Sequence, residues 1–376
     1  MKKRNQCVIC DSVKLEFLYN FQKFPIYMGI SKNNNDKFYD QHWVICKDCG
    51  TIQLQYLIDL DELYGVPHNP AVGNMWRMHH KKFAKYAQQY LGKNILEIGG
   101  GNLIIANNIC ENNKDIRKYI IYDKHFDYTE NKHNAIYIKQ EFFTENQDIE
   151  NEIIDTIILS HTFEHFYDIN KYCKKFNEIL SDKGKIIISI PHIKKWLSNN
   201  FTNALQFEHT YMVDENNLQF ILSKHAFKLI NIEWFSEYNL FITFEKQEKL
   251  KVFTLNNNYE ENKKIFSNFI EFQINNIKNI NEQLKKYENY DLYIFGCHVF
   301  AQYMTYFGLN ESMFKGLLDN DINKQQYRLY GTSLITFSPN IIKYVKKPCV
   351  IVQMGIYTEE ICEQLIHLNK NVKIIK

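Results

Sequence analysis

The chain has 376 residues, enough for two or three domains of about 150 residues each. Its composition of 45% hydrophobic, 15% aromatic and 23% charged residues excludes a disordered or collagen-like protein. The 45 Lys and Arg residues nearly balance the 43 Asp and Glu residues, so we do not expect a broad nucleic-acid-binding surface. The N-terminus lacks the apolar stretch of a secretory signal, and no apolar run approaches the roughly 20 residues of a membrane helix. We therefore expect a soluble, cytoplasmic protein.

Two C-x-x-C pairs stand near the N-terminus, Cys7 with Cys10 and Cys46 with Cys49. Each pair can form a tight turn whose two thiolates face one ion, and Gly50 permits the positive backbone angle that such a turn often needs. Four thiolates around Zn²⁺ leave no open coordination position, so the expected role is structural. A small segment with few core residues needs such support. We predict a zinc-binding module over residues 1–70.

A nucleotide-binding core is expected after a helix over residues 76–90. A short apolar strand over residues 95–98 runs into Gly99-Gly-Gly101, and a helix begins near Leu103. Strand, glycine turn and helix together favour a nucleotide ligand, because the glycines let it approach helix N–H groups. The pattern lacks the third glycine of the dinucleotide fingerprint. Glu97 within the strand would repel a pyrophosphate but suits a ligand that carries an ammonium group.

Further strands are predicted over residues 119–122, 135–138, 153–159 and 185–189, each followed by polar or aromatic residues. An acid at the end of the second strand, Asp123, is placed to hold ribose hydroxyls. Glu141 and Phe142 follow the third strand, where a carboxylate and a ring can meet a purine. The fourth strand ends at Ser160, and His192 follows the fifth, on the edge of the sheet that binds ligands. We predict an α/β core over residues 71–250.

This ordered set of motifs resembles the class I S-adenosylmethionine-dependent methyltransferases. The resemblance implies that the glycine loop contacts the methionine part, the acid after the second strand the ribose, and the third-strand loop the adenine. The cofactor-binding residues that we expect are Glu97, Gly99, Gly101, Asp123, Glu141, Phe142 and Ser160. Leu103 stands where many members have a third glycine. A Rossmann-like domain for another nucleotide is the alternative.

A smaller α/β domain is predicted over residues 251–376. A polar helix over residues 256–289 has an apolar stripe at helical spacing. A strand, a turn at Gly296 and a helix follow, with further strands near residues 317–320 and 349–352. Two interpretations stay open: the Gly296 turn binds the nucleotide half of a substrate, or the domain only buries surface and positions the core.

The three parts in this order resemble the sugar C-methyltransferases that act on nucleotide-linked deoxy-ketosugars, including the stretch over residues 315–324 and Tyr330-Gly-Thr332. The resemblance implies that His161 and the pair Glu208-His209 serve the reaction, in surface polysaccharide or deoxysugar biosynthesis. Histidine titrates near neutrality, so His209 suits the base that removes a proton beside a ketone, with a carboxylate neighbour to orient it. His161 suits the donor to the enolate oxygen.

Other functions remain open from the sequence. Gln206 stands where this family commonly has a tyrosine, so an O-methyltransferase that acts on a sugar hydroxyl is the first alternative. A non-catalytic zinc-ribbon protein that binds nucleic acid is the second, although the ribbon lacks interleaved basic and aromatic residues. His68, His79 and His80 either contact substrate or decorate an exposed helix. We expect a small-molecule partner, with no nucleic acid and no membrane, and count His79, His192 and Gly296 as substrate-binding.

Overall fold

The computed structural model describes residues 1–32, 35–65, 74–126, 130–149 and 153–376. The chain divides into two compact units, and each is assembled from three segments. The first unit comprises Met1–Leu18, Trp43–Lys195 and Glu208–Lys263. The second comprises Tyr19–His42, Trp196–Phe207 and Lys264–Lys376.

The first unit is built on a seven-stranded sheet with the order β12-β13-β11-β10-β7-β8-β9. Its strands are β7 (Asn94–Ile98), β8 (Lys118–Tyr122), β9 (Ile136–Lys139), β10 (Ile154–Ser160), β11 (Leu180–Pro191), β12 (Phe227–Ser236) and β13 (Asn239–Lys246). β13 runs antiparallel to both of its neighbours, β11 and β12, and the other strand pairs are parallel. The strand order changes direction between β7 and β10. Parallel strands with such a switch point confirm the predicted α/β fold class.

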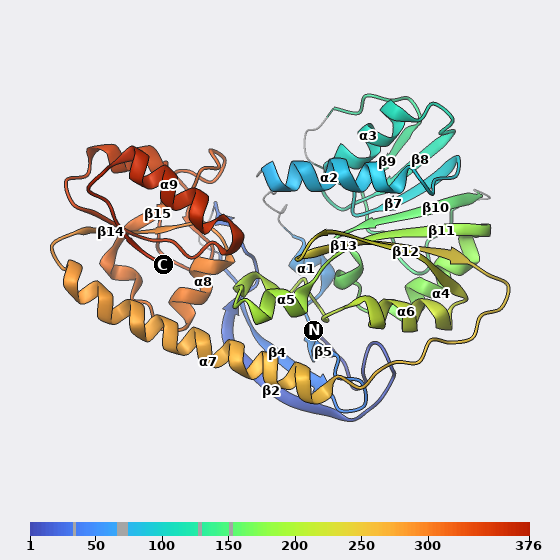
Figure 1. Ribbon diagram of the computed structural model, residues 1–376, viewed down its shortest axis with the longest axis horizontal. Helices are drawn as coiled ribbons and strands as arrows, with labels where there is room; N and C mark the ends of the chain where they lie inside the picture. The colour runs from blue at the N-terminus through green and yellow to red at the C-terminus, as the bar shows by residue number, and fades with distance from the viewer. Residues whose placement is uncertain (33–34, 66–73, 127–129, 150–152) are drawn as a thin grey trace. The chain divides into compact units, whose positions relative to one another are not determined.

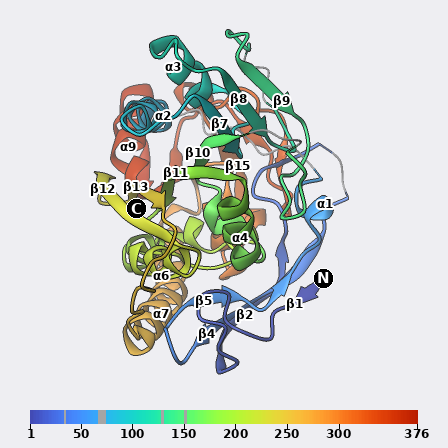
Figure 2. The same cartoon turned by 90° about the vertical axis from the view of Figure 1, so that its right-hand side faces the viewer.

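Helices cover both faces of this sheet (Figures 1 and 2). One face packs against α2 (Asn74–Ala87) and α3 (Ile104–Asn112), and the other against α4 (Ile169–Ile179) and α6 (Glu215–Lys224). Alternate residues of one strand reach opposite cores: Ile95 faces α2 and α3, whereas Leu96 and Ile98 face α4 and α6. Burial on both faces explains why the strands are continuous apolar runs in the sequence.

The N-terminal part of the first unit consists of short strands and one helical turn. These are β1 (Lys2–Lys3), β5 (Ile52–Leu54), β6 (Tyr56–Leu57) and α1 (Leu60–Leu63), with β1 paired to β6. Three of the paired cysteines belong to the same hydrophobic core as α4 and α6. Four elements begin in one unit and end in the other: β2 (Leu15–Pro25), β4 (Phe38–Cys46), α5 (Ile193–Ser198) and α7 (Tyr259–Leu284).

The second unit is built on a parallel sheet with the order β17-β15-β14-β18-β19. Its strands are β14 (Asp291–Phe295), β15 (Phe314–Leu318), β17 (Thr336–Phe337), β18 (Pro348–Ile351) and β19 (Lys373–Ile375). Residues of α7 and of α8 (Val299–Tyr306) pack on one face, and α9 (Thr358–Leu368) packs on the other. In the described part of the chain, no helix combines the length and apolar content that a bilayer crossing requires.

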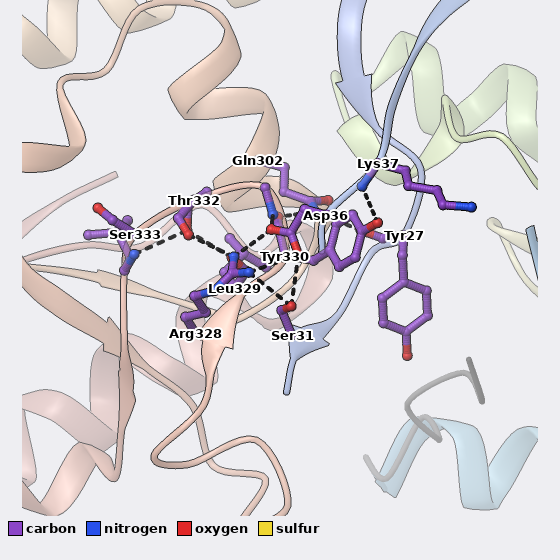
Figure 3. Close-up of polar contacts among 12 residues, drawn as sticks. Tyr27, Ser31, Asp36, Lys37, Gln302, Arg328, Leu329, Tyr330, Thr332 and Ser333 are labelled. Atoms are coloured by element: carbon purple, nitrogen blue, oxygen red, sulfur yellow. Dashed lines mark hydrogen bonds and ion pairs between the residues drawn. The ribbon is translucent and has the colours of Figure 1, made fainter. Parts of the chain in front are cut away.

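An ion pair joins two distant segments within the second unit (Figure 3). β3 (Ile30–Ser31) pairs with β16 (Arg328–Leu329), and Arg328 donates from both terminal nitrogens to the Asp36 carboxylate. The same carboxylate accepts from Ser31 Oγ at 2.8 Å and from the Gly331 N–H at 2.7 Å. The side chains of Arg328 and Asp36 are only 17% and 8% exposed. Loss of either partner would therefore leave the other as an unpaired charge that is largely shielded from water.

We expect Arg328→Ala to lower the free energy of unfolding by about 3 kcal/mol, measured by urea denaturation, because Asp36 would keep a half-buried charge without its cation. The matched control is Lys285→Ala, which breaks an exposed pair with Glu282 and should cost about 0.5 kcal/mol or less. Equal losses in the two variants would contradict the structural role of Asp36.

Candidate functional site

A cavity of about 810 Å³ opens within the first unit where β7, β8 and β10 end. Strand ends supply one wall, and α1 with the chain that follows it supplies another. This is the switch point of the sheet, where ligands bind in folds of this kind. Among the residues predicted from the sequence, Gly99, Asp123, Phe142, His161 and Glu208 line this cavity.

The glycine loop after β7 is shaped by close packing. Gly99 has φ of +82°, and a Cβ there would lie 2.3 Å from Thr162 Oγ1. A Cβ on Gly101 would lie 2.2 Å from the carbonyl oxygen of His125. Leu103 has φ of 54° and therefore takes the left-handed conformation, at the position where the methyltransferases that the sequence resembles often have glycine. For a residue with a side chain this conformation costs about 1 kcal/mol.

Asp123 joins the end of β8 to this loop. Its Oδ2 accepts from the Gly101 N–H at 2.9 Å, and its Oδ1 accepts from the His125 N–H at 2.9 Å. A carboxylate oxygen can accept more than one hydrogen bond, so a group of this type at the cavity wall suits a ligand hydroxyl.

Glu97 lies behind the glycine loop and does not line the cavity. It is buried and accepts from the Tyr119 hydroxyl at 2.8 Å. A Cβ on Gly100 would lie 2.5 Å from the Glu97 carboxyl carbon. Burial raises the pKa of Glu97 to about 7, against the smaller opposing effect of the Tyr119 hydrogen bond. In this geometry Glu97 supports the loop.

An aromatic wall follows β9. The ring of Phe142 lies 5.5 Å from that of Tyr64, measured between centroids, and Lys124 Nζ lies 5.1 Å from the Phe142 centroid. Glu141 is exposed and accepts from Gln147, and neither Glu141 nor Ser160 lines the cavity. Phe142, Tyr64 and Asp123 all line the cavity.

Imidazoles gather at the end of β10. His161 has φ of 51°, and its ring centroid lies 4.9 Å from that of His79 and 4.8 Å from that of Trp76. Burial, together with neighbouring imidazoles, lowers the pKa of His161 well below its usual value. Its Nδ1 lies 3.7 Å from Glu164 Oε1.

Glu164, His165 and His209 form a second cluster beside His161. One possible ligand atom from each of the three lies within 4.8 Å of the others. Glu164 and His165 belong to the short helix η1 (Phe163–His165), and burial raises the pKa of Glu164 to about 8. Sequence reasoning assigned Glu164 and His165 no role, because the proximity of His209 follows from the fold and not from spacing in the chain.

The remaining predicted residues lie outside the cavity wall. His79 is 1% exposed, its Nε2 lies 2.8 Å from Ser189 Oγ, and burial lowers its pKa to about 3. His80 Nε2 lies 3.3 Å from Asn102 Nδ2, and His68 falls outside the described residues. The His192 ring lies 5.2 Å from that of Trp234.

Two lysines close to His192 in the sequence, and the predicted Gly296 turn, have protein partners. Lys194 and Lys195 form ion pairs with Glu261 and Glu237 at 2.7 and 3.0 Å. Gly296 is in the second unit with φ of +98°, and a Cβ there would lie 2.3 Å from Met354 Sδ. Met354 therefore packs directly against the Gly296 turn.

The structure brings the two cysteine pairs together. Cys7 Sγ lies 3.6 Å from Cys49 Sγ, and Cys10 Sγ lies 3.5 Å from Cys46 Sγ, with all four sulfurs within 4.8 Å of one another. Gly50 has φ of +79° and packs against the backbone of residues 258–259, which leaves no room for a Cβ. Four converging thiols are the donor set and geometry that structural zinc prefers.

Comparisons with known proteins concern the first unit. Residues 75–232 match a family model described as "Methyltransferase domain". Similar solved structures include the N-methyltransferase NodS from Bradyrhizobium japonicum WM9 in complex with S-adenosyl-l-homocysteine, with 13% identity, a TM-score of 0.36 and coverage of 47% of this chain and 90% of that one. Another is magnesium protoporphyrin IX methyltransferase (ChlM) from Synechocystis PCC 6803, with 12% identity, a TM-score of 0.36 and coverage of 49% and 91%. No curated protein matches the sequence of this chain.

The matched region extends from α2 into β12 and contains the glycine loop, Asp123 and His161. It carries the parallel strands β7 to β11, whose ends supply one wall of the cavity. Residues 75–232 therefore form a methyltransferase domain of the class I fold.

Proposed function

We propose that the enzyme methylates a carbon of a ketosugar, free or nucleotide-linked, in surface polysaccharide or deoxysugar biosynthesis. The observation that carries this proposal is the composition of one cavity. Asp123 and the glycine loop line it together with His161 and Glu208, so cofactor-type and acid–base-type groups share one space. Placing an acceptor against the methyl group in such a space supplies much of the rate.

The cofactor roles follow the cavity wall. Gly99 and Gly101 would contact the methionine part of the cofactor. Asp123 would accept hydrogen bonds from the ribose hydroxyls. Phe142 would cover the adenine, with Glu141 near the exocyclic amine of that base. Glu97 would support the glycine loop from the side away from the cofactor. Ser160, the last residue of β10, would lie beneath the methyl group of the cofactor. When bound, S-adenosylmethionine supplies an electrophilic methyl group whose sulfur leaves as a neutral thioether.

The acceptor roles fall to the pair Glu208-His209 and to His161. The pair removes the proton on the carbon beside the ketone, the C–H electron pair forms the enolate, and the carbon then bonds to the methyl. His161 donates to the enolate oxygen, which its neutral imidazole can do. Glu208 lines the cavity, whereas His209 lies behind the wall and is 5% exposed.

Transfer to a sugar hydroxyl is the second candidate. Gln206, almost fully buried, stands where the sugar C-methyltransferases commonly have a tyrosine. O-methylation needs only one base, and the pair Glu208-His209 meets that need.

The outer parts of the chain receive structural roles in this proposal. Residues 1–70 would form a module held by zinc at Cys7, Cys10, Cys46 and Cys49, residues 71–250 the core, and residues 251–376 the C-terminal domain. For Gly296, packing against Met354 favours the purely structural interpretation over nucleotide binding. We keep His79 and His192 as residues that shape the acceptor side, His79 through Ser189.

The experiment that tests the function supplies ¹³C-methyl S-adenosylmethionine with a panel of nucleotide-linked and free ketosugars. NMR of the product should show the label bonded to a ring carbon. A label in a methoxy group would establish the second candidate, and no transfer to any sugar would reject both.

His161→Ala and His209→Ala should each lower kcat by at least about 100-fold and leave S-adenosylmethionine affinity unchanged in calorimetry, because both groups act on the acceptor. His367→Ala, on the exposed face of α9, is the control and should match the wild type. Near-full turnover in both active-site variants would remove them from the mechanism.

Asp123→Ala should weaken S-adenosylmethionine binding by roughly 10- to 100-fold, because charge-assisted hydrogen bonds to the ribose would be lost. Calorimetry measures the change. Glu111→Ala, an exposed carboxylate on α3, serves as the control for charge. Unchanged affinity in Asp123→Ala would contradict the ribose role.

Cys46→Ser should lose the zinc bound at the cysteine cluster and lower the thermal stability of the chain, because the converging thiols would repel or require protons without the ion. Metal analysis and thermal unfolding give the two measurements. Cys362→Ser, at a lone buried thiol in the second unit, should retain the metal. Wild-type protein with free thiols at all four positions and no zinc would refute the site.

A further inference from the structure

Glu164 is a buried carboxyl group in need of a positive partner. It is 0% exposed, and neither of its oxygens has a hydrogen-bond partner in another described residue. The His161 Nδ1 atom lies 3.7 Å from Glu164 Oε1. An uncompensated carboxylate in such a place is strongly disfavoured, so a cation beside it would stabilise the fold.

The groups around Glu164 are metal ligands by type and by distance. A carboxylate oxygen of Glu164 and one nitrogen each from His165 and His209 lie within 4.8 Å of one another. One carboxylate and two imidazoles form the donor set found in open sites for divalent first-row transition metals.

The backbone holds these ligands in place before any ion binds. The Thr210 N–H donates to the Glu164 carbonyl oxygen at 3.1 Å, and the Tyr211 hydroxyl donates to the Phe163 carbonyl oxygen at 2.6 Å. The Met212 N–H donates to the Ile52 carbonyl oxygen in β5 at 2.9 Å. His209 is therefore fixed against η1, although 44 residues separate it from His165.

A second contact orients one ligand. The Tyr64 hydroxyl lies 3.2 Å from His165 Nδ1 and so holds the ring beside Glu164 and His209. Metal-binding histidines characteristically use their other ring nitrogen in such a bond. His165 also lines the cavity, so an ion at this place would have an open position toward the acceptor.

We propose that Glu164, His165 and His209 bind a divalent first-row transition metal at the cavity wall, separate from the cysteine cluster. The open position would take the ketone or hydroxyl oxygen of the acceptor. A His209 nitrogen bound to metal takes no proton, so within the pair Glu208-His209 the proton would pass to Glu208. The site itself does not depend on the identity of the acceptor.

The test uses tag-free full-length protein, stripped by a chelator and reloaded with Co²⁺, with neither S-adenosylmethionine nor acceptor present. We expect two equivalents of Co²⁺ per chain: one with the intense sulfur-to-metal absorption of thiolate ligands, and one with only the weak bands of nitrogen and oxygen ligands. Glu164→Gln should lose the second and keep the first. Cys46→Ser should show the reverse.

Glu97→Gln is the matched control, because it changes another fully buried carboxyl group that has no imidazole partner and should keep both equivalents. If Glu164→Gln does not fold, His165→Gln at a half-buried position replaces it and should lose the same equivalent. One equivalent in the wild type, or a second equivalent that persists in the variants, would overturn the site. Because no turnover is measured, that result would leave the proposed reaction standing.

Discussion

The geometry of the cavity depends on the hydrogen bonds that Asp123 accepts. Its carboxylate takes the N–H groups of Gly101 and His125, and so joins the ends of two neighbouring strands. The glycine loop after β7 can pack this closely against its neighbours only because Gly99 and Gly101 carry no side chain. This wall of the cavity is already formed before a ligand binds, so binding costs little conformational entropy there.

Burial then determines the charge state of the groups around that wall. Glu97 and Glu164 have raised pKa values, and His79 and His161 have lowered ones, in each case mainly because the protein interior disfavours the charged form. Glu97 accepts a hydrogen bond from a tyrosine hydroxyl, whereas the Glu164 oxygens accept none from another residue in the described part of the chain. The same physical cause thus leads to a structural group in one place and an unsatisfied one in the other.

The sequence was most informative where elements are buried on both faces. β7, β8, β10 and β14 are short apolar runs followed by glycine or polar residues, and local pattern alone predicts them. Strands β12 and β13 were not predicted; the burial of β12 is irregular and its pairing with β13 contains bulges, whereas β13 is a buried run that the sequence analysis missed. Contacts between distant segments were also missed, such as that between Asp36 and Arg328 or between Glu164 and the chain after His209. Such contacts leave no local pattern in the sequence, and the proposed metal-binding side chains beside the cavity depend on them.

The interleaved construction of the two units has a consequence for synthesis on the ribosome. The first unit needs the chain as far as Lys263, and the second needs it as far as Lys376, yet both use residues from the first fifty. Neither unit can fold completely when only half of the chain has been synthesised. The N-terminal segments therefore remain without their partners until much later parts of the chain have been made. Folding of this kind is governed by late, long-range closure. A shortened gene that ends after the methyltransferase domain would leave two orphaned segments in its product.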